Sequence, residues 1–185
     1  MSLSKSEVTK EKIIRGAIDV IRRDGLQACT HRAVAEESGV SLGTTTYQFR
    51  TLDDLLIAVM QLAIDEFRRS TRAWLELNSS GLPEEALTRF VIWTLSERPR
   101  LNIEYELFVA AVSRPLLRPC AMRWLNEHET LLTEYLQLTP DKARAAVSFI
   151  DAWLMRGILD EPEMALPEDL ICTVFRAIIN QPQAG

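Results

Sequence analysis

One stretch of the chain decides the fold: Thr30-His-Arg-Ala-Val-Ala-Glu-Glu-Ser-Gly-Val-Ser-Leu-Gly-Thr-Thr-Thr-Tyr-Gln-Phe-Arg50. Thr30 is suited to cap a helix, and the apolar pair Val34 and Ala35 gives residues 31–38 one inward face. Gly39 then interrupts the helical pattern, because glycine readily adopts the left-handed conformation that ends a helix. A short helix followed at once by such a turn predicts a compact helical corner.

The second helix of this corner is predicted over residues 42–49. Ser41 is placed to cap it, and Val40 can fill the angle between the two helices. Two short helices joined in this way are typical of a helix-turn-helix. Eight residues of helix are roughly 12 Å long, which fits a DNA major groove about 12 Å wide. Gly43 and Thr44 are small enough to let the backbone approach base edges. A helical corner without any DNA role is the alternative interpretation.

A longer helix precedes the corner. Ser4 and Glu7 have the spacing of a capping box, and Gly25 is placed to end the helix. Apolar residues recur at helical spacing within the predicted helix over residues 7–24, namely at Ile13, Ile14, Ala17, Ile18 and Ile21. Its apolar face would supply the core that the two short helices cannot make alone.

The rest of the chain also has a helical pattern. Thr51 with Asp54 indicates the start of a long helix, and residues 78–83 form the clearest linker. Further helices are predicted over 84–97, 100–113, 119–138, 141–159 and 167–180, with prolines at the breaks. No strand alternation of useful length occurs. The sequence therefore predicts an all-α fold, with a helix-turn-helix domain over residues 1–52 and a larger helical domain over residues 53–185.

Charge limits the kind of DNA contact that is possible. The chain has 185 residues, and its net charge is −5. Residues 1–54 hold eight basic and eight acidic side chains, so the whole net charge lies in residues 55–185. A broad basic field is excluded, and any DNA contact has to be local and geometric.

Membrane, secreted and metal-binding classes are disfavoured. No apolar run approaches the roughly 20 residues that a membrane helix needs. The three cysteines, Cys29, Cys120 and Cys172, are widely spaced, and no pair has metal-ligand spacing. They indicate either reduced thiols of a cytoplasmic protein or small buried apolar side chains. We expect no metal site and no cofactor.

The corner and the residues on both sides of it carry a family resemblance. From Ile14 to Leu56 the sequence resembles the TetR family of transcriptional regulators; beyond residue 57 only the helical layout is similar. The matching positions are Ile14, Ala17, Gly25, Thr30, Arg32, Val34, Ala35, Ser38, Gly39, Val40, Ser41, Gly43, Thr44, Tyr47, Phe49, Asp53, Asp54, Leu55 and Leu56.

The resemblance implies a set of DNA contacts. Arg32 matches a position that commonly reaches a base, where a guanidinium can pair with guanine; contact with phosphate alone is the alternative. Tyr47 matches an aromatic residue that packs on the sugar-phosphate backbone, and Leu42 could contact a thymine methyl group. The predicted DNA-binding residues are Thr30, Arg32, Ser41, Leu42, Gly43, Thr44, Thr46, Tyr47 and Gln48.

The sequence departs from the family at three positions near these contacts. Thr45 stands where Leu is frequent, and Thr46 stands where a first Tyr is frequent. Leu52 replaces a frequent Lys at the start of the long helix, which removes one phosphate contact. We expect the N–H groups at that helix start to remain available to phosphate.

The resemblance also implies a dimer, and the two C-terminal helices carry broad apolar stripes that suit a four-helix bundle. The predicted interface residues are Ala143, Val147, Ile150, Leu154, Gly157, Ile171, Val174, Phe175 and Ile178. The alternative is that these stripes serve only the core of one subunit. Paired subunits would place two reading helices about 34–36 Å apart, which matches successive major grooves.

The middle helices are candidates for a small-molecule pocket. Its predicted residues are Trp93, Glu104, Phe108, Trp124, His128 and Trp153. His128 is either a ligand contact or an ordinary core histidine, and Glu104 is either a cation anchor or a solvated boundary charge. Trp93 and Trp153 could equally belong to the core. Mainly apolar and aromatic walls would suit a hydrophobic or aromatic effector.

Together these features predict a dimeric DNA-binding regulator, most simply a repressor that a small effector releases from a palindromic operator. The alternative function is a dimeric small-molecule-binding module without sequence-specific DNA recognition. An enzyme is disfavoured, because His31 and His128 are the only histidines and no nucleophile or phosphate-binding motif occurs.

Overall fold

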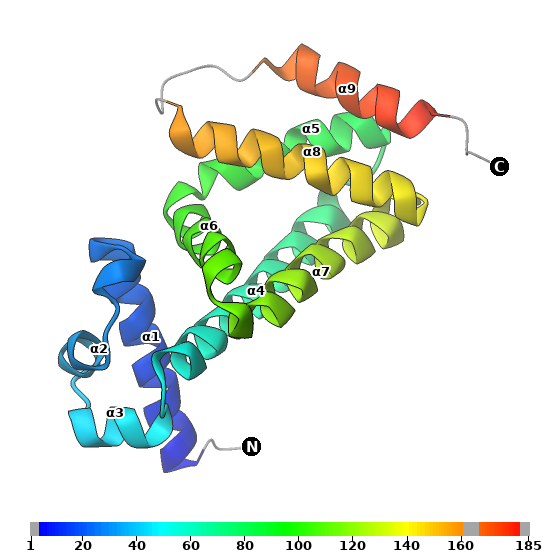
Figure 1. Ribbon diagram of the computed structural model, residues 1–185. Coiled ribbons are helices and arrows are strands. Elements are labelled where there is room, and N and C mark those ends of the chain that lie inside the picture. The colour runs from blue at the N-terminus through cyan, green and yellow to red at the C-terminus, as the bar shows by residue number, and fades with distance from the viewer. Residues whose placement is uncertain (1–3, 161–166, 182–185) are drawn as a thin grey trace. The chain divides into compact units, whose positions relative to one another are not determined.

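The computed structural model describes residues 4–160 and 167–181, and within them the fold is all-α (Figure 1). The elements are α1 (Lys5–Asp24), η1 (Leu26–Ala28), α2 (His31–Ser38), α3 (Leu42–Gln48), α4 (Leu52–Asn78), α5 (Pro83–Ser96), α6 (Arg98–Ser113), η2 (Pro115–Leu117), α7 (Arg118–Leu136), α8 (Pro140–Leu159) and α9 (Glu168–Asn180). The prediction of an all-α chain with a helix-turn-helix near its start is confirmed. Pro162, one of the prolines expected at a break, lies outside the described residues.

The chain forms two compact units that do not follow a single cut in the sequence. The first unit contains the residues up to Asp65 together with Asn102–Met122. The second contains Glu66–Leu101 and the residues from Arg123 onward. Helices α4, α6 and α7 therefore each contribute residues to both units. The functional division at residue 52 stays a prediction.

Local capping explains why the first helices begin and end where they do. The Ser4 side chain accepts a hydrogen bond from the Glu7 N–H, and the Glu7 carboxylate accepts one from the Ser4 N–H. Thr30 and Ser41 cap α2 and α3 in the same sense, each accepting from an N–H three residues later. Gly39 ends α2 with φ 63°, the left-handed conformation that glycine adopts without strain.

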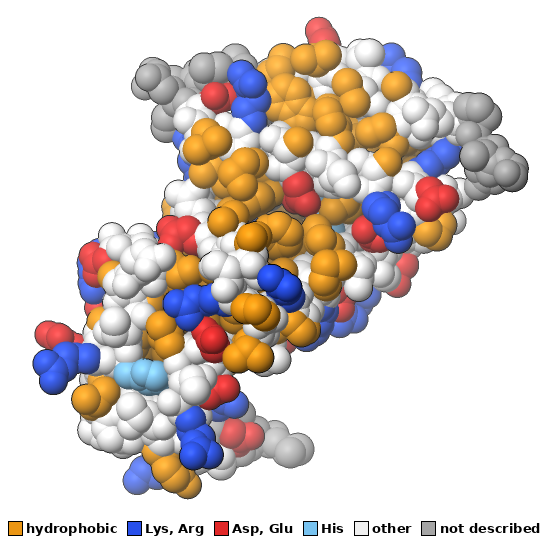
Figure 2. Space-filling view, in the orientation of Figure 1, with side chains coloured by type: hydrophobic (Ala, Val, Ile, Leu, Met, Phe, Trp, Pro, Cys, Tyr) orange, Lys and Arg blue, Asp and Glu red, His pale blue; other side chains and the backbone are white. Residues whose placement is uncertain are grey.

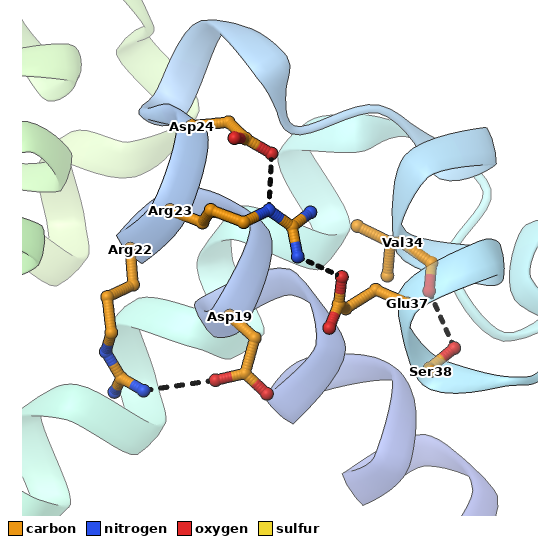
Figure 3. A network of polar contacts seen from close by, with 7 residues as sticks. All are labelled: Asp19, Arg22, Arg23, Asp24, Val34, Glu37 and Ser38. Carbon is orange, nitrogen blue, oxygen red and sulfur yellow. Dashed lines mark hydrogen bonds and ion pairs between the residues drawn. The ribbon is translucent and has the colours of Figure 1, made fainter.

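Helix α1 crosses α2 at close range because Gly16 has no side chain. A Cβ atom placed at Gly16 would lie 2.8 Å from the Cβ atom of Ser38. Arg23, near the end of α1, fastens the same two helices by an ion pair of 2.6 Å with Glu37 and also bonds Asp24, as Figure 3 shows. Opposite-charge pairs on this surface add little stability, but they fix orientation.

The segment Asn102–Met122 supplies two polar contacts to the rest of the first unit. The Glu106 carboxylate accepts a hydrogen bond of 2.7 Å from the N–H of Leu26, directly after the turn that ends α1. Arg114, directly after α6, donates to the carboxylate of Asp53 on α4 at 2.5 Å. Residues far along the chain thus complete the unit that contains the helix-turn-helix.

In the second unit, α8 and α9 pack on α5. Phe175 of α9 and Ile150 of α8 are fully buried within the single chain. Arg98, at the start of α6, donates hydrogen bonds to the carbonyl groups of Gly157, Ile158 and Asp160. These bonds satisfy carbonyl groups that a helix end otherwise leaves unpaired.

Candidate nucleic-acid interface and candidate effector site

Most of the predicted DNA-binding residues form an exposed surface on α3 and on the residues that precede α2 and α3. Tyr47 is 83% exposed and Leu42 is 43% exposed, whereas Thr45 is the only buried residue of α3. We call the set the reading surface: Thr30, Arg32, Ser41, Leu42, Gly43, Thr44, Thr46, Tyr47 and Gln48. All of these are exposed except Thr44 and Gln48, which are half-buried.

Hydrogen bonds hold α3 in place from behind the reading surface. The Thr45 hydroxyl donates to the carbonyl of Ser41, and the His31 ring bonds the carbonyl of Phe49 at 2.9 Å. Gln48 donates from its side-chain amide to the hydroxyl of Ser6 on α1 at 3.2 Å. Gln48 therefore anchors α3 to α1.

Arg32 differs from its basic neighbours on α1. Arg15 and Arg22 pair with Glu11 and Asp19 one helical turn away, and Arg23 pairs with Glu37. Among the described residues, none forms a hydrogen bond or an ion pair with the exposed Arg32 guanidinium. A free guanidinium can make the paired hydrogen bonds that recognise guanine.

The start of α4 is less suited to phosphate than the sequence suggests. The Asp54 N–H donates to the Thr51 hydroxyl, and the Thr51 N–H donates to the Asp54 carboxylate. These bonds from Thr51 hold the pKa of Asp54 below its usual value. The expectation of free N–H groups is therefore wrong for Asp54, and the carboxylates of Asp53 and Asp54 add negative charge that opposes phosphate.

A connected group of rings occupies the second unit. The Phe67 ring on α4 lies 5.6 Å from Trp124 and 5.2 Å from His128, both on α7. The Phe90 ring on α5 lies 5.3 Å from His128 and 5.4 Å from Trp74 of α4. With the ring of Trp93, which stacks on Trp74 at 5.4 Å, these residues form what we call the aromatic cluster: Phe67, Trp74, Phe90, Trp93, Trp124 and His128.

The structure brings together only some of the predicted pocket residues. Trp93, Trp124 and His128 belong to the aromatic cluster. Trp153 lies on α8, where its ring is 6.1 Å from that of Phe149. Glu104 and Phe108 belong to the first unit, in which Glu104 is only 3% exposed. A role for these three residues in effector binding stays a prediction.

Sequence reasoning missed the ring residues that connect the cluster. Phe67 and Trp74 are seven positions apart on α4, with Thr71 between them, so all three lie on one face of the helix. Phe90 is fully buried on α5. The helical spacing of Phe67, Thr71 and Trp74 was the signal available in the sequence. The same spacing also occurs on a helix face that only packs in the core.

Two polar side chains are buried in this region without a partner. His128 is 3% exposed, and burial lowers its pKa to about 4, so its ring is neutral near pH 7. Among the described residues, none forms a hydrogen bond with His128 Nε2 or with the hydroxyl of the fully buried Thr71. An unpaired buried polar group costs free energy.

The residues predicted to form a dimer interface are mostly inside one subunit. Those buried against the chain's own core are Ala143, Val147, Ile150, Leu154, Ile171 and Phe175. Gly157 packs on α5, because a Cβ atom there would lie 2.5 Å from a methyl carbon of Leu95. Val174 and Ile178 are half-buried and keep some free surface. The interface itself stays a prediction, but these stripes serve the subunit core.

Within residues 4–160 and 167–181, no cluster of three or more His, Cys, Asp or Glu side chains could hold a metal ion. Over the same residues, every helix is too short or too polar to cross a bilayer.

Comparisons with known proteins agree with this geometry. A family model described as the C-terminal domain of tetracyclin repressor-like proteins matches residues 79–180. The chain belongs to the TetR family of transcriptional regulators. A comparison with curated protein sequences gives no match. For a TetR-family chain, the early helix-turn-helix and the helical body that follows it are the expected architecture.

Solved TetR-family structures resemble the whole chain. The multidrug binding protein EbrR complexed with imidazole is 34% identical, with a TM-score of 0.82 over 94% of this chain and 96% of that chain. EbrR complexed with ethidium is 34% identical, with a TM-score of 0.79 over 92% of this chain and 98% of that chain. A TetR-family member from Streptomyces coelicolor A3 (SCO1917) is 33% identical, with a TM-score of 0.78 over 94% of this chain and 99% of that chain.

Proposed function

We propose that this TetR-family chain is a repressor that binds a palindromic operator as a homodimer and leaves it when an aromatic effector binds. The exposed reading surface carries the proposal: α3 buries only Thr45, and Arg32 offers an unpaired guanidinium beside it. An acidic chain can bind DNA in this way because the contact is local and two-fold repeated.

The dimer would use the outer faces of α8 and α9. Leu159 is 78% exposed and Leu170 is 53% exposed, and Val174 and Ile178 add half-buried apolar surface on α9. Figure 2 shows hydrophobic side chains gathered over these two helices. An exposed apolar patch on a subunit surface is typical of an interface.

The effector would bind at the aromatic cluster. Solved EbrR structures are described as complexes with ethidium, malachite green and proflavin. Stacked rings and a neutral His128 are compatible with such aromatic cations, because ring faces attract positive charge. Effector binding would shift the population towards dimers whose reading surfaces no longer fit successive grooves, with about 1–3 kcal/mol of coupling. Helix α4, which contributes to both units, would transmit the change.

DNA binding is tested by footprinting DNA from around the protein's own gene with wild-type protein, Arg32→Ala and Tyr47→Ala. We expect one protected palindrome, and a loss of affinity of roughly tenfold or more in each variant. The oligomeric state of the variants serves as the control, because both substitutions lie outside α8 and α9. A stable dimer that protects no site would instead favour the small-molecule-binding module.

Effector release is tested by adding proflavin to the protein–operator complex. Planar dyes also intercalate into DNA, so the same titration is repeated with Trp93→Leu protein on the same DNA. We expect the variant complex to need more dye for release. Equal release curves would mean that intercalation alone displaces the protein, and the effector site would be rejected.

A further inference from the structure

Thr71 differs from most other helical threonines among the described residues. The hydroxyl groups of Thr88 and Thr94, which are also buried, each donate to the carbonyl four residues earlier at 2.8 Å. Exposed helical threonines such as Thr130 and Thr173 do the same. The hydroxyl of Thr71 makes no hydrogen bond within the described residues, although it is fully buried. Its hydroxyl is therefore unused by its own helix.

On α7, His128 also has a buried polar atom without a hydrogen-bond partner. Its Nε2 atom is buried and has no hydrogen-bond partner within the described residues. The ring is held by edge-on contact with Phe67 and tilted contact with Phe90. Buried polar atoms in folded proteins are nearly always paired, so two unpaired atoms in one region require an explanation.

Thr71 and His128 belong to the same unit and are linked through the aromatic cluster. On α4, Thr71 lies one turn after Phe67 and one turn before Trp74, on the same helix face. The Phe67 ring contacts His128, the His128 ring contacts Phe90, and Phe90 in turn contacts Trp74. These contacts form a chain of aromatic side chains that begins at Phe67 and ends at Trp74, on the face of α4 that carries Thr71.

We propose that the Thr71 hydroxyl and His128 Nε2 are the hydrogen-bonding pair of the effector site, and that they select aromatic ligands bearing N–H donors, such as aromatic amines. This inference rests on the proposed effector function. The Thr71 hydroxyl oxygen offers a lone pair to a donor, and Nε2 offers one in the tautomer of His128 that carries its proton on Nδ1. The ring faces around them carry partial negative charge, which favours a positively polarised N–H over a carbonyl oxygen.

The neutral state of His128 fits the same ligand class. A protonated imidazole could not accept a hydrogen bond, and it would repel a cationic ring system. Burial lowers the pKa of His128 to about 4, so near pH 7 the ring keeps an unprotonated nitrogen.

The test measures the affinity of two dyes for the full-length protein without DNA, by fluorescence or calorimetry. Proflavin carries two aromatic amino groups, and its tetramethyl derivative acridine orange has the same ring system and charge but no amino N–H. The proteins are wild type, Thr71→Val, His128→Phe and the control Thr88→Val, which removes a hydroxyl that is already paired.

We expect wild type to prefer proflavin, and Thr71→Val to weaken proflavin binding by roughly tenfold, the value of one hydrogen bond, while acridine orange binding is unchanged. His128→Phe should act in the same direction, and Thr88→Val should leave both affinities as in wild type. Thr71→Val should melt no lower than wild type in the absence of dye, because the lost hydroxyl has no partner.

Other results overturn the proposal in distinguishable ways. An equal loss for both dyes in Thr71→Val, or no loss for either, would show that the hydroxyl does not recognise the amino group. If neither dye binds wild type while operator binding is intact, the ligand class is wrong and the DNA-binding function stands. If the dyes bind as expected but no operator is found, the hydrogen-bonding pair stands and the regulator function fails.

Discussion

The helices that carry the reading surface begin at caps formed by residues three positions apart, whereas the aromatic cluster joins side chains from α4, α5 and α7. Ser41 caps α3 through the N–H of Thr44, and Thr30 caps α2 in the same way. In the cluster, Phe67 reaches His128 across the unit. The helix starts of the first region can be specified by a short stretch of sequence, and the second region requires the folded chain.

The two regions also treat polar groups differently. Around α3, polar groups are exposed or paired, as in the bonds of Thr45 and His31. In the second unit, Thr71 and His128 are buried and unpaired. A region that keeps unpaired polar groups sacrifices stability, which is typical of a binding site awaiting a ligand.

The largest expected effect on the free energy of unfolding is in the aromatic cluster. Phe90→Ala removes a fully buried ring that contacts Trp74, Trp93 and His128, and we expect a loss of about 3–5 kcal/mol of unfolding free energy. Urea denaturation measures it. Phe108→Ala, at a half-buried position, is the control and should cost clearly less. Equal costs would mean that the cluster is not a tightly packed part of the core.

The corresponding packing test in the first unit is Gly16→Ala. The added methyl group would overlap Ser38, so α1 and α2 must separate, at an expected cost of about 1–3 kcal/mol. Gly43→Ala on α3 is the matched control, because nothing lies within 4 Å of a Cβ atom there. Thermal melting of the two variants checks the prediction, which fails if both behave alike.

The buried His128 predicts a pH dependence of stability. Its pKa is lowered to about 4 in the folded protein from a usual value of 6.5. Between these values the unfolded chain binds more protons, so stability is complete above pH 6.5 and falls as the pH drops towards 4. We expect about 2 kcal/mol of loss between pH 7 and pH 5 from this group. In urea denaturation at the two pH values, His128→Phe should lack this component; an unchanged pH dependence would contradict burial of the ring.

The smallest expected effect on stability is at the cap of α3. Ser41→Ala removes the acceptor of the Thr44 N–H and should cost about 1 kcal/mol. Ser148→Ala is the control, because the Ser148 hydroxyl is exposed and bonds only within α8. Chemical denaturation would measure both. A cost for Ser41→Ala no greater than that of the control would show that local capping does not hold α3.

Most of the fold could be predicted because its signals are local. Ser4, Thr30 and Ser41 cap helices where expected, and α2 has the predicted bounds. Pro99 was expected at a break but lies in the first turn of α6, a position where proline costs no hydrogen bond. Interactions of this kind depend only on residues that are close together in the sequence.

The sites could be predicted only in part. A residue's burial depends on what packs against it. The helical spacing of Phe175 and Ile150 therefore does not show whether they lie in the subunit core or in a dimer interface, and the structure places both in the core. Gly157 lets α8 approach Leu95 closely within the subunit. A small residue at this position would equally allow close approach of a second subunit, so the sequence does not distinguish the two. Likewise, nothing in the sequence shows that the hydroxyl of Thr71 is unpaired.

The bonds from Glu106 to Leu26 and from Arg114 to Asp53 have a practical consequence for anyone dissecting the protein. A fragment ending at residue 52 would leave the Leu26 amide without its acceptor and would lack the α6 segment altogether. A chimera that joins this helix-turn-helix to another protein should therefore also include residues 102–122.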